Sequence, residues 1–315
     1  MMDATGGTPT AREAAYRRHG LFSRARVREW LYGLALLSPS FALFAVFTFY
    51  PLVKGAYLGL YRSDPFGLHR VFIGFDQYLH VLRSGGFQSS LGVTFWFAVY
   101  TVPAGLVLGL ALALLAHQRL RGMIIYRAVF SSTLASSVAV ASVMWLTLLN
   151  PSVGILNYGL RESGVGAIQW LNDPRWALLA VSLTTTWLNL SFTFIVLLAG
   201  LQTIPEQMYE SAKIDGAGAW SRFRNVTLPM LSPTIFFSLV VLTIRAFESF
   251  GQIDILTQGG PLKRTNVIVY SIYTEAFKNF NEGVAAAQAI FLFLIILVLT
   301  LVQFRFLERR VFYGS

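Results

Sequence analysis

Six long stretches of this sequence contain no charged residue, and they restrict the possible fold more than any other feature. They cover residues 30–53, 84–118, 128–160, 176–205, 225–244 and 283–304. An α-helix needs roughly 20 residues to cross the hydrocarbon core of a bilayer, and each stretch reaches that length. The sequence therefore predicts an all-α polytopic membrane protein with six transmembrane helices. We place these spans at about residues 30–53, 91–117, 128–149, 177–203, 231–250 and 285–306.

The composition agrees with a membrane location and argues against several other classes of protein. Of the 315 residues, 55% are hydrophobic and only 13% are charged, which is too few charges to cover a soluble globule. The absence of cysteine excludes disulfides and thiolate chemistry. The four histidines are scattered and form no H-E-x-x-H motif, so a membrane enzyme is disfavoured and no metal site is predicted. A proton-coupled carrier would need several ionisable groups in its spans, where only Arg245 and Glu248 occur.

Lys and Arg residues are divided unevenly between the two sides of the expected membrane domain, residues 30–312. Fifteen of the 25 fall in the N-terminal segment 1–29, the loops 117–127 and 204–230, and the C-terminal end, against nine in the alternate loops. Because cytoplasmic loops carry an excess of basic residues, we expect both termini in the cytoplasm. This sorting, with attraction to anionic lipid, explains most of the net charge of +10. Nucleic-acid binding is disfavoured, since no soluble domain carries a basic face.

Small residues in two spans indicate how these helices pack. Gly105 and Gly109 lie four residues apart in the second span and form a face that lets another helix approach closely. The third span is rich in serine and threonine, including Thr133, Ser136 and Ser137. We favour hydrogen bonding between helices as their role, and lining of a translocation path remains the alternative.

The loop between the fourth and fifth spans, residues 204–230, has a distinctive spacing of polar, small and turn-forming residues. It reads Glu210-Ser211-Ala212, then Gly216 after three residues, then Val226-x-Leu228-Pro229 after nine more. We expect a short helix over 206–214 that ends at Gly216, because glycine adopts the left-handed conformation without steric cost. A second helix should run from about 217 to the region of Asn225, and Leu228-Pro229 should redirect the chain into the fifth span. An amphipathic loop helix lying on the bilayer is the alternative.

This spacing resembles the coupling loop of ATP-binding-cassette importer permeases, E-A-A-x3-G-x9-I-x-L-P, with Ser211 and Val226 as similar-sized departures. The resemblance implies the type I importer permease fold, in a bacterial plasma membrane. It also implies that the loop docks in a cleft of a nucleotide-binding subunit and transmits ATP-driven closure to the spans. The residues implied in this coupling are Glu210, Ser211, Ala212, Asp215, Gly216, Val226, Leu228 and Pro229.

The chain has no phosphate-binding loop of the form G-x4-G-K-[S/T], so it is not expected to hydrolyse ATP itself. The chain is expected to bind no cofactor, with ATP and Mg²⁺ held by partner subunits. The resemblance implies a second homologous permease subunit, two ATP-binding subunits and an extracytoplasmic solute-binding protein, besides membrane lipid. Nucleic acid is not expected as a partner.

Four segments bear on the solute that is imported. Residues 72–78 and 256–261 resemble carbohydrate-type permeases of the maltose kind. Residues 64–67 (Asp-Pro-Phe-Gly) and the terminal run 287–308 resemble one branch more closely, the permeases for glycerol-3-phosphate and glycerophosphodiesters such as glycerophosphocholine. The resemblance therefore favours that branch, and a sugar importer of the maltose or trehalose type is the alternative.

Arg245 and Glu248 in the fifth span are candidates for the translocation pathway. An unpaired Arg at a helix centre costs about 2.5–3.5 kcal/mol by insertion scales, so Arg245 should face protein or water. Glu248 lies three residues on, hence on the same face, and is the expected partner. Two interpretations stay open: a structural ion pair, or contact of Arg245 with a phosphate in transit. The candidate pathway residues are Arg245, Glu248, Ser249, Gln252, Trp187 and Asn189.

Overall fold

The computed structural model describes residues 24–63, 70–118, 122–164 and 166–307, and the chain divides into two compact units after Lys54. In the first unit the described residues form helix α2 (Arg24–Phe44), the π-helical turn η1 (Ala45–Phe49) and the beginning of α3 (Tyr50–Leu58). The stretch Trp30–Leu58 is long and apolar enough to cross a membrane. The N-terminal segment up to residue 23, residues 64–67 of the solute-related segments and the end of the chain from residue 308 lie outside the described residues.

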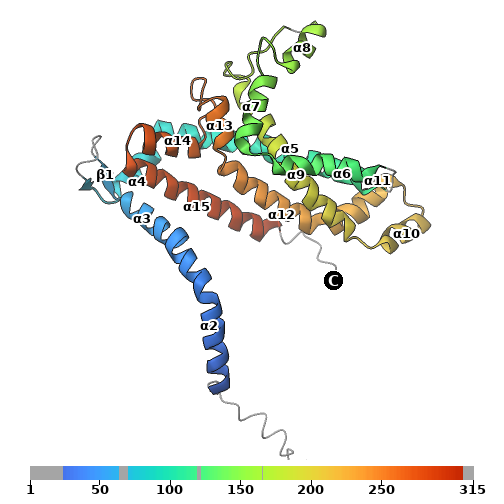
Figure 1. Ribbon diagram of the computed structural model, residues 1–315, viewed down its shortest axis with the longest axis horizontal. Coiled ribbons are helices and arrows are strands. Elements are labelled where there is room, and N and C mark those ends of the chain that lie inside the picture. Colours follow the sequence, from blue (N-terminus) through green and yellow to red (C-terminus); the bar gives the residue numbers. More distant parts are fainter. Residues whose placement is uncertain (1–23, 64–69, 119–121, 165, 308–315) are drawn as a thin grey trace, which may run out of the picture. The chain divides into compact units, whose positions relative to one another are not determined.

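Four long helices form the framework of the second unit (Figure 1). Helix α5 (Gly85–His117) packs along α9 (Ala177–Gln202), and α12 (Leu228–Phe247) packs against both. Helix α15 (Glu282–Leu307) lies against α12. Buried side chains of these helices and of the shorter elements packed on them form two hydrophobic clusters, one around Phe97, Val181 and Ile268 and the other around Phe194 and Leu231. The framework is thus a bundle of long apolar helices, as the charge-free stretches predict.

Shorter elements cover the ends of this framework. Helix α4 (Asp76–Arg83) and helix α14 (Ile268–Tyr273) pack on α15, and a π-helical turn η4 (Thr274–Lys278) follows α14. Helix α8 (Ile155–Glu162) lies in the segment before α9, and helix α13 (Gly251–Leu256) packs on α9. The prediction of a helical membrane protein is confirmed with one addition, the antiparallel pair β1 (Tyr61–Ser63) and β2 (Arg70–Phe72).

The third predicted span, 128–149, is not one straight helix. It consists of α6 (Met123–Ser132) with the 3-10 turn η2 (Thr133–Ala135), and of α7 (Val138–Leu148), which are bent by 106° at the break between them. Ser137 caps α7, since its hydroxyl accepts a hydrogen bond from the Val140 amide at 3.2 Å. The described residues therefore hold five helices able to cross a membrane, or six if the bent pair is one span.

The expectation that Leu228-Pro229 redirects the chain was wrong. Helix α11 (Ala219–Arg222), the π-helical turn η3 (Phe223–Thr227) and α12 form one continuous helical stretch, Ala219–Phe247. The Leu228 amide donates to the Phe223 carbonyl five residues back, and this wider turn accommodates the ring of Pro229 without ending the helix. The same arrangement precedes Pro51, where the Tyr50 amide donates to the Ala45 carbonyl.

The small-residue face of α5 packs inside this chain. A Cβ atom on Gly109 would lie 2.5 Å from Cγ2 of Thr193 on α9, and one on Gly105 would contact Leu242 of α12. The hydroxyl of Thr133 contacts that of Ser191, whose own hydroxyl donates to the Phe130 carbonyl at 2.6 Å. The interpretation of these residues as helix-packing groups is confirmed at these positions.

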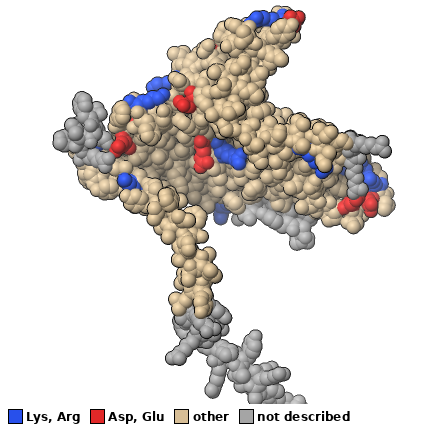
Figure 2. Space-filling view, in the orientation of Figure 1, with Lys and Arg blue, Asp and Glu red and all other residues tan. Residues whose placement is uncertain are grey.

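On the face shown in Figure 2, the charged side chains stand in small separate groups on a surface otherwise formed by uncharged residues. Such a surface suits a protein surrounded by lipid, because a bilayer core does not need charges to solvate it. The exposed charges therefore mark the places where the chain meets water or a partner.

Candidate functional site

The first half of the coupling-loop motif forms helix α10 (Glu206–Ile214) and the turn that ends it. Gly216 has a φ of +77°, as expected. The Gly216 amide donates to the Lys213 carbonyl at 3.0 Å, and the Ala217 amide donates to the Ala212 carbonyl at 2.9 Å. This pair of hydrogen bonds is a Schellman cap, which satisfies the last carbonyls of the helix. The local signals in the sequence thus fix both the length of α10 and its stop.

The second half of the motif lies where the loop joins the long helix. Val226, Leu228 and Pro229 are half-buried in η3 and the start of α12. Tyr209 of α10 turns toward the same junction, where its hydroxyl lies 3.1 Å from that of Thr227. Tyr209 therefore stabilises this chain's own loop.

The two halves differ in what they offer to another protein. Glu210, Ser211, Asp215 and Gly216 are exposed, while Ala212 is half-buried. Ile214 on α10 is 86% exposed, and Trp220 on α11 is 72% exposed. Large apolar side chains at such exposure beside polar residues are typical of a contact surface. A cavity of about 1200 Å³ adjoins α10 and α11 and is lined by Tyr209, Lys213 and Trp220 among others.

A second candidate site is an open cavity of about 410 Å³ lined by α7, α9 and the junction of α12 with α13. It lies where the bend before α7 and the break between α12 and α13 meet the middle of α9. Helix α12 ends at Phe247, and Glu248, Ser249 and Phe250 separate it from α13. The residues lining the cavity are Val138, Thr185, Leu188, Asn189, Arg245, Glu248, Ser249, Phe250, Gly251 and Gln252.

Arg245 is held in this cavity by uncharged groups. Its Nη1 donates to Asn189 Oδ1 at 3.1 Å, and its guanidinium carbon lies 4.2 Å from the ring centre of Phe192. Glu248 does not pair with Arg245 in the structure, where the two charged groups make no contact within 4.0 Å. Glu248 caps the end of α12 and is exposed. Arg245 thus contacts a neutral amide and an aromatic ring, and the carboxylate of Glu248 lines the same cavity beyond ion-pair distance.

Two further predicted residues are fixed by hydrogen bonds near Arg245. The Ser249 hydroxyl donates to the Arg245 carbonyl at 2.8 Å, and Gln252 Nε2 donates to the Thr185 hydroxyl at 3.1 Å. Trp187 does not line the cavity; it packs edge-on against Trp145 of α7, with 6.1 Å between ring centres. Five of the six candidate pathway residues therefore gather at one cavity, and the sixth belongs to the hydrophobic core around it.

Sequence reasoning missed Phe192 and Val138. Phe192 could have been found, because it lies three residues after Asn189, on the same face of α9. Val138 reaches the cavity only because the chain bends, which hydropathy does not report. The described residues contain no group of three or more His, Cys, Asp or Glu that could hold a metal ion.

Comparisons with known proteins agree over most of the chain. The model of a family described as "Binding-protein-dependent transport system inner membrane component" matches residues 105–313. The chain is 40% identical over 282 residues to the sn-glycerol-3-phosphate transport system permease protein UgpA of Agrobacterium fabrum (strain C58 / ATCC 33970), covering 89% of this chain and 95% of that protein. It is 35% identical over 286 residues to the protein of the same name in Yersinia pestis, covering 90% and 96%.

A solved structure supports the same architecture. A chain of a bacterial ABC transporter involved in the import of the acidic polysaccharide alginate superposes with a TM-score of 0.78 at 25% identity. The match covers 91% of this chain and 98% of that one. A second structure of that kind of transporter, in complex with an alginate pentasaccharide-bound periplasmic protein, gives the same TM-score and identity.

Proposed function

Since the chain belongs to the family of binding-protein-dependent transport system inner membrane components, we propose that it forms half of the import pathway for sn-glycerol 3-phosphate or glycerophosphodiesters such as glycerophosphocholine. It is a multi-pass membrane permease of an ABC importer, and its family is a transport component rather than a catalytic one. The names of its UgpA relatives, at 35–40% identity over about nine-tenths of the chain, support the choice of solute.

The observation that carries the choice of an anionic solute is the environment of Arg245. A guanidinium has five N–H donors, and the described part of the chain gives it one hydrogen bond, from Nη1 to Asn189. The planar fork suits two phosphate oxygens at once. The amide of Gln252 lines the same cavity and has a second N–H besides the one donated to Thr185. A phosphate entering the cavity would accept hydrogen bonds from the N–H donors of Arg245 that the described residues leave unused.

The coupling loop is proposed to bind a separate ATP-hydrolysing subunit. Its exposed surface on α10 and α11, with Glu210 as the charged group, supports docking into a partner's cleft. We propose a complex of this chain, a second homologous permease, two ATP-binding subunits that carry ATP and Mg²⁺, and a solute-binding protein. A periplasmic binding protein accompanies the alginate transporter in its structure, which supports the last of these partners. Both termini would then lie in the cytoplasm, as the Arg-rich N-terminal segment suggests.

Uptake by the reconstituted complex tests this function. With its binding protein and ATP, the complex in proteoliposomes should accumulate labelled sn-glycerol 3-phosphate, or glycerophosphocholine, and not maltose. The structural similarity to an alginate transporter favours the alternative, a sugar importer. A sugar importer would accumulate maltose and neither phosphate ester. That result would refute the proposed solute but would leave the assignment as an ABC importer intact.

A further inference from the structure

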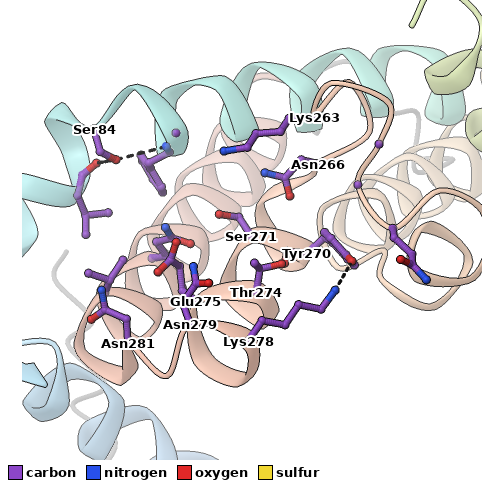
Figure 3. Close-up of a pocket in the computed structure, with 18 of the residues that line it drawn as sticks. Ser84, Lys263, Asn266, Tyr270, Ser271, Thr274, Glu275, Lys278, Asn279 and Asn281 are labelled. Atoms are coloured by element: carbon purple, nitrogen blue, oxygen red, sulfur yellow. Dashed lines mark hydrogen bonds between the residues drawn. The ribbon is translucent and has the colours of Figure 1, made fainter. Parts of the chain in front are cut away.

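A second polar pocket, distinct from the Arg245 cavity, lies between the start of α5 and the segment that joins α13 to α15 (Figure 3). Its volume is about 480 Å³, within the usual range of small-molecule sites. Residues from the end of α4, the loop 257–267, α14, η4 and α15 line it, and no residue is shared with the Arg245 cavity. Figure 3 shows Lys263 and Asn266 reaching toward Ser271, Thr274 and Glu275 across one space.

Two ammonium groups and one carboxylate line this pocket. Lys278 is held in place: its Nζ donates to the Tyr270 hydroxyl at 2.8 Å and lies 5.1 Å and 5.4 Å from the ring centres of Tyr270 and Tyr273. The hydrogen bond to Tyr270 raises the pKa of Lys278, so this ammonium is charged at neutral pH. Lys263 and Glu275 supply the other two charges. The pocket therefore carries a net positive charge from its Lys and Glu side chains, with Lys donors left over for an anion.

The wall formed by α15 contains an unsatisfied polar group. Gln288 lines the pocket and is only 4% exposed, yet its Oε1 has no hydrogen-bond partner among the described residues. Buried side-chain oxygens are normally hydrogen-bonded, because leaving one unpaired costs free energy. A ligand hydroxyl would provide the missing donor. The carboxylate of Glu275 is a second acceptor for such hydroxyls.

We propose that this pocket binds a phosphate ester that carries free hydroxyl groups, with its phosphate at Lys263 and Lys278 and a hydroxyl at Gln288. Such a group is present in sn-glycerol 3-phosphate and in the head group of phosphatidylglycerol. The inference goes beyond the proposed import function, because the ligand chemistry follows from this pocket's own side chains. Neither Arg245 nor the coupling loop takes part in the proposed binding.

Binding to the purified complete complex, without its binding protein, tests the proposal. In phosphatidylcholine nanodiscs, the complex should bind labelled sn-glycerol 3-phosphate. Lys263→Ala and Lys278→Ala should each weaken that binding roughly tenfold, the effect of losing a hydrogen bond to a charged group. Gln288→Leu should reduce the preference for sn-glycerol 3-phosphate over inorganic phosphate. In nanodiscs of mixed phosphatidylglycerol and phosphatidylcholine, native mass spectrometry should count fewer retained phosphatidylglycerol molecules in the Lys variants.

The binding of free solute and the retention of lipid distinguish the two possible sources of the phosphate ester. An effect of the Lys variants on the free solute identifies a solute site, and an effect only on lipid retention identifies a head-group site. Arg264→Ala is the matched control, since Arg264 is adjacent to Lys263 but lines a different cavity with Arg175. Arg245→Gln should leave the pocket's binding intact, which separates this proposal from the import pathway. Wild-type protein that binds neither probe, or binding that the Lys variants leave unchanged, would overturn the proposal.

Discussion

Replacing Gly216 with valine is expected to abolish most ATP-driven uptake while the amount of complex in the membrane stays unchanged. The φ of +77° places Gly216 in the left-handed region, which a β-branched residue adopts only at a cost of about 1–3 kcal/mol. A Cβ there would meet no atom within 4 Å, so the whole effect acts through the backbone. The Schellman cap would open, and α10 would lose its orientation relative to α11 and α12.

A matched control lies two residues further along the same loop. Gly218 has an extended backbone, with φ −68° and ψ 173°, and a Cβ on it would also meet nothing within 4 Å. Gly218→Val should therefore retain uptake, because valine favours extended backbone. The measurements are uptake and stimulated ATPase activity in proteoliposomes, with membrane levels by immunoblot. Normal uptake in Gly216→Val, or an equal loss in both variants, would contradict the role of the turn.

Arg245→Gln is expected to lower uptake of phosphate-bearing solutes by roughly 10- to 100-fold. Hydrogen bonds to a charged group contribute about 1.5–3 kcal/mol each. The substitution removes both the positive charge and the parallel N–H donors of the guanidinium. Assembly and basal ATPase activity should survive, because Asn189 and Phe192 are the groups that Arg245 contacts and neither is a charge left unpaired. Arg245→Lys should restore only part of the uptake, since an ammonium binds a phosphate as a point charge.

Glu248→Gln is the companion variant that separates the two interpretations of this pair. Glu248 is exposed and lies beyond ion-pair distance of Arg245, so its neutralisation should leave the amount of complex unchanged. If Arg245→Gln and Glu248→Gln both lower the amount of folded complex, a structural ion pair is the better account. If Arg245→Gln leaves uptake of sn-glycerol 3-phosphate intact, the phosphate contact is wrong.

Features set by neighbours in the sequence could be predicted. Helix α10 and the turn at Gly216 follow from residues within a few positions of one another. The long apolar helices follow from charge-free stretches, because a bilayer imposes one length on every span. Pro229 misled the prediction, since a local rule for proline does not include the π-helical turn that accommodates it.

Features set by contacts between distant segments could not be predicted. Sequence spacing offered Arg245 a partner three residues away, but its hydrogen bond goes to Asn189, 56 positions earlier on another helix. The bend at Ser136–Ser137 changes no hydropathy average, yet it brings Val138 to the cavity wall. From the sequence, Gln288 is one polar residue in an apolar span, and only the structure shows that it lines the same pocket as Lys263 and Lys278.

Cross-linking from α10 tests most directly the central claim that this chain is driven through its loop by a separate ATPase. The chain has no cysteine, so Ile214→Cys would introduce its sole thiol, at a side chain that is 86% exposed. Leu262→Cys, at an 85% exposed position in the loop 257–267, is the control. In the complete complex, a thiol-reactive photo-cross-linker on Ile214→Cys should join this chain to the ATP-binding subunit, and the one on Leu262→Cys should not. No product with that subunit from Ile214→Cys, or an equal product from Leu262→Cys, would contradict both the coupling role of the loop and its cytoplasmic location.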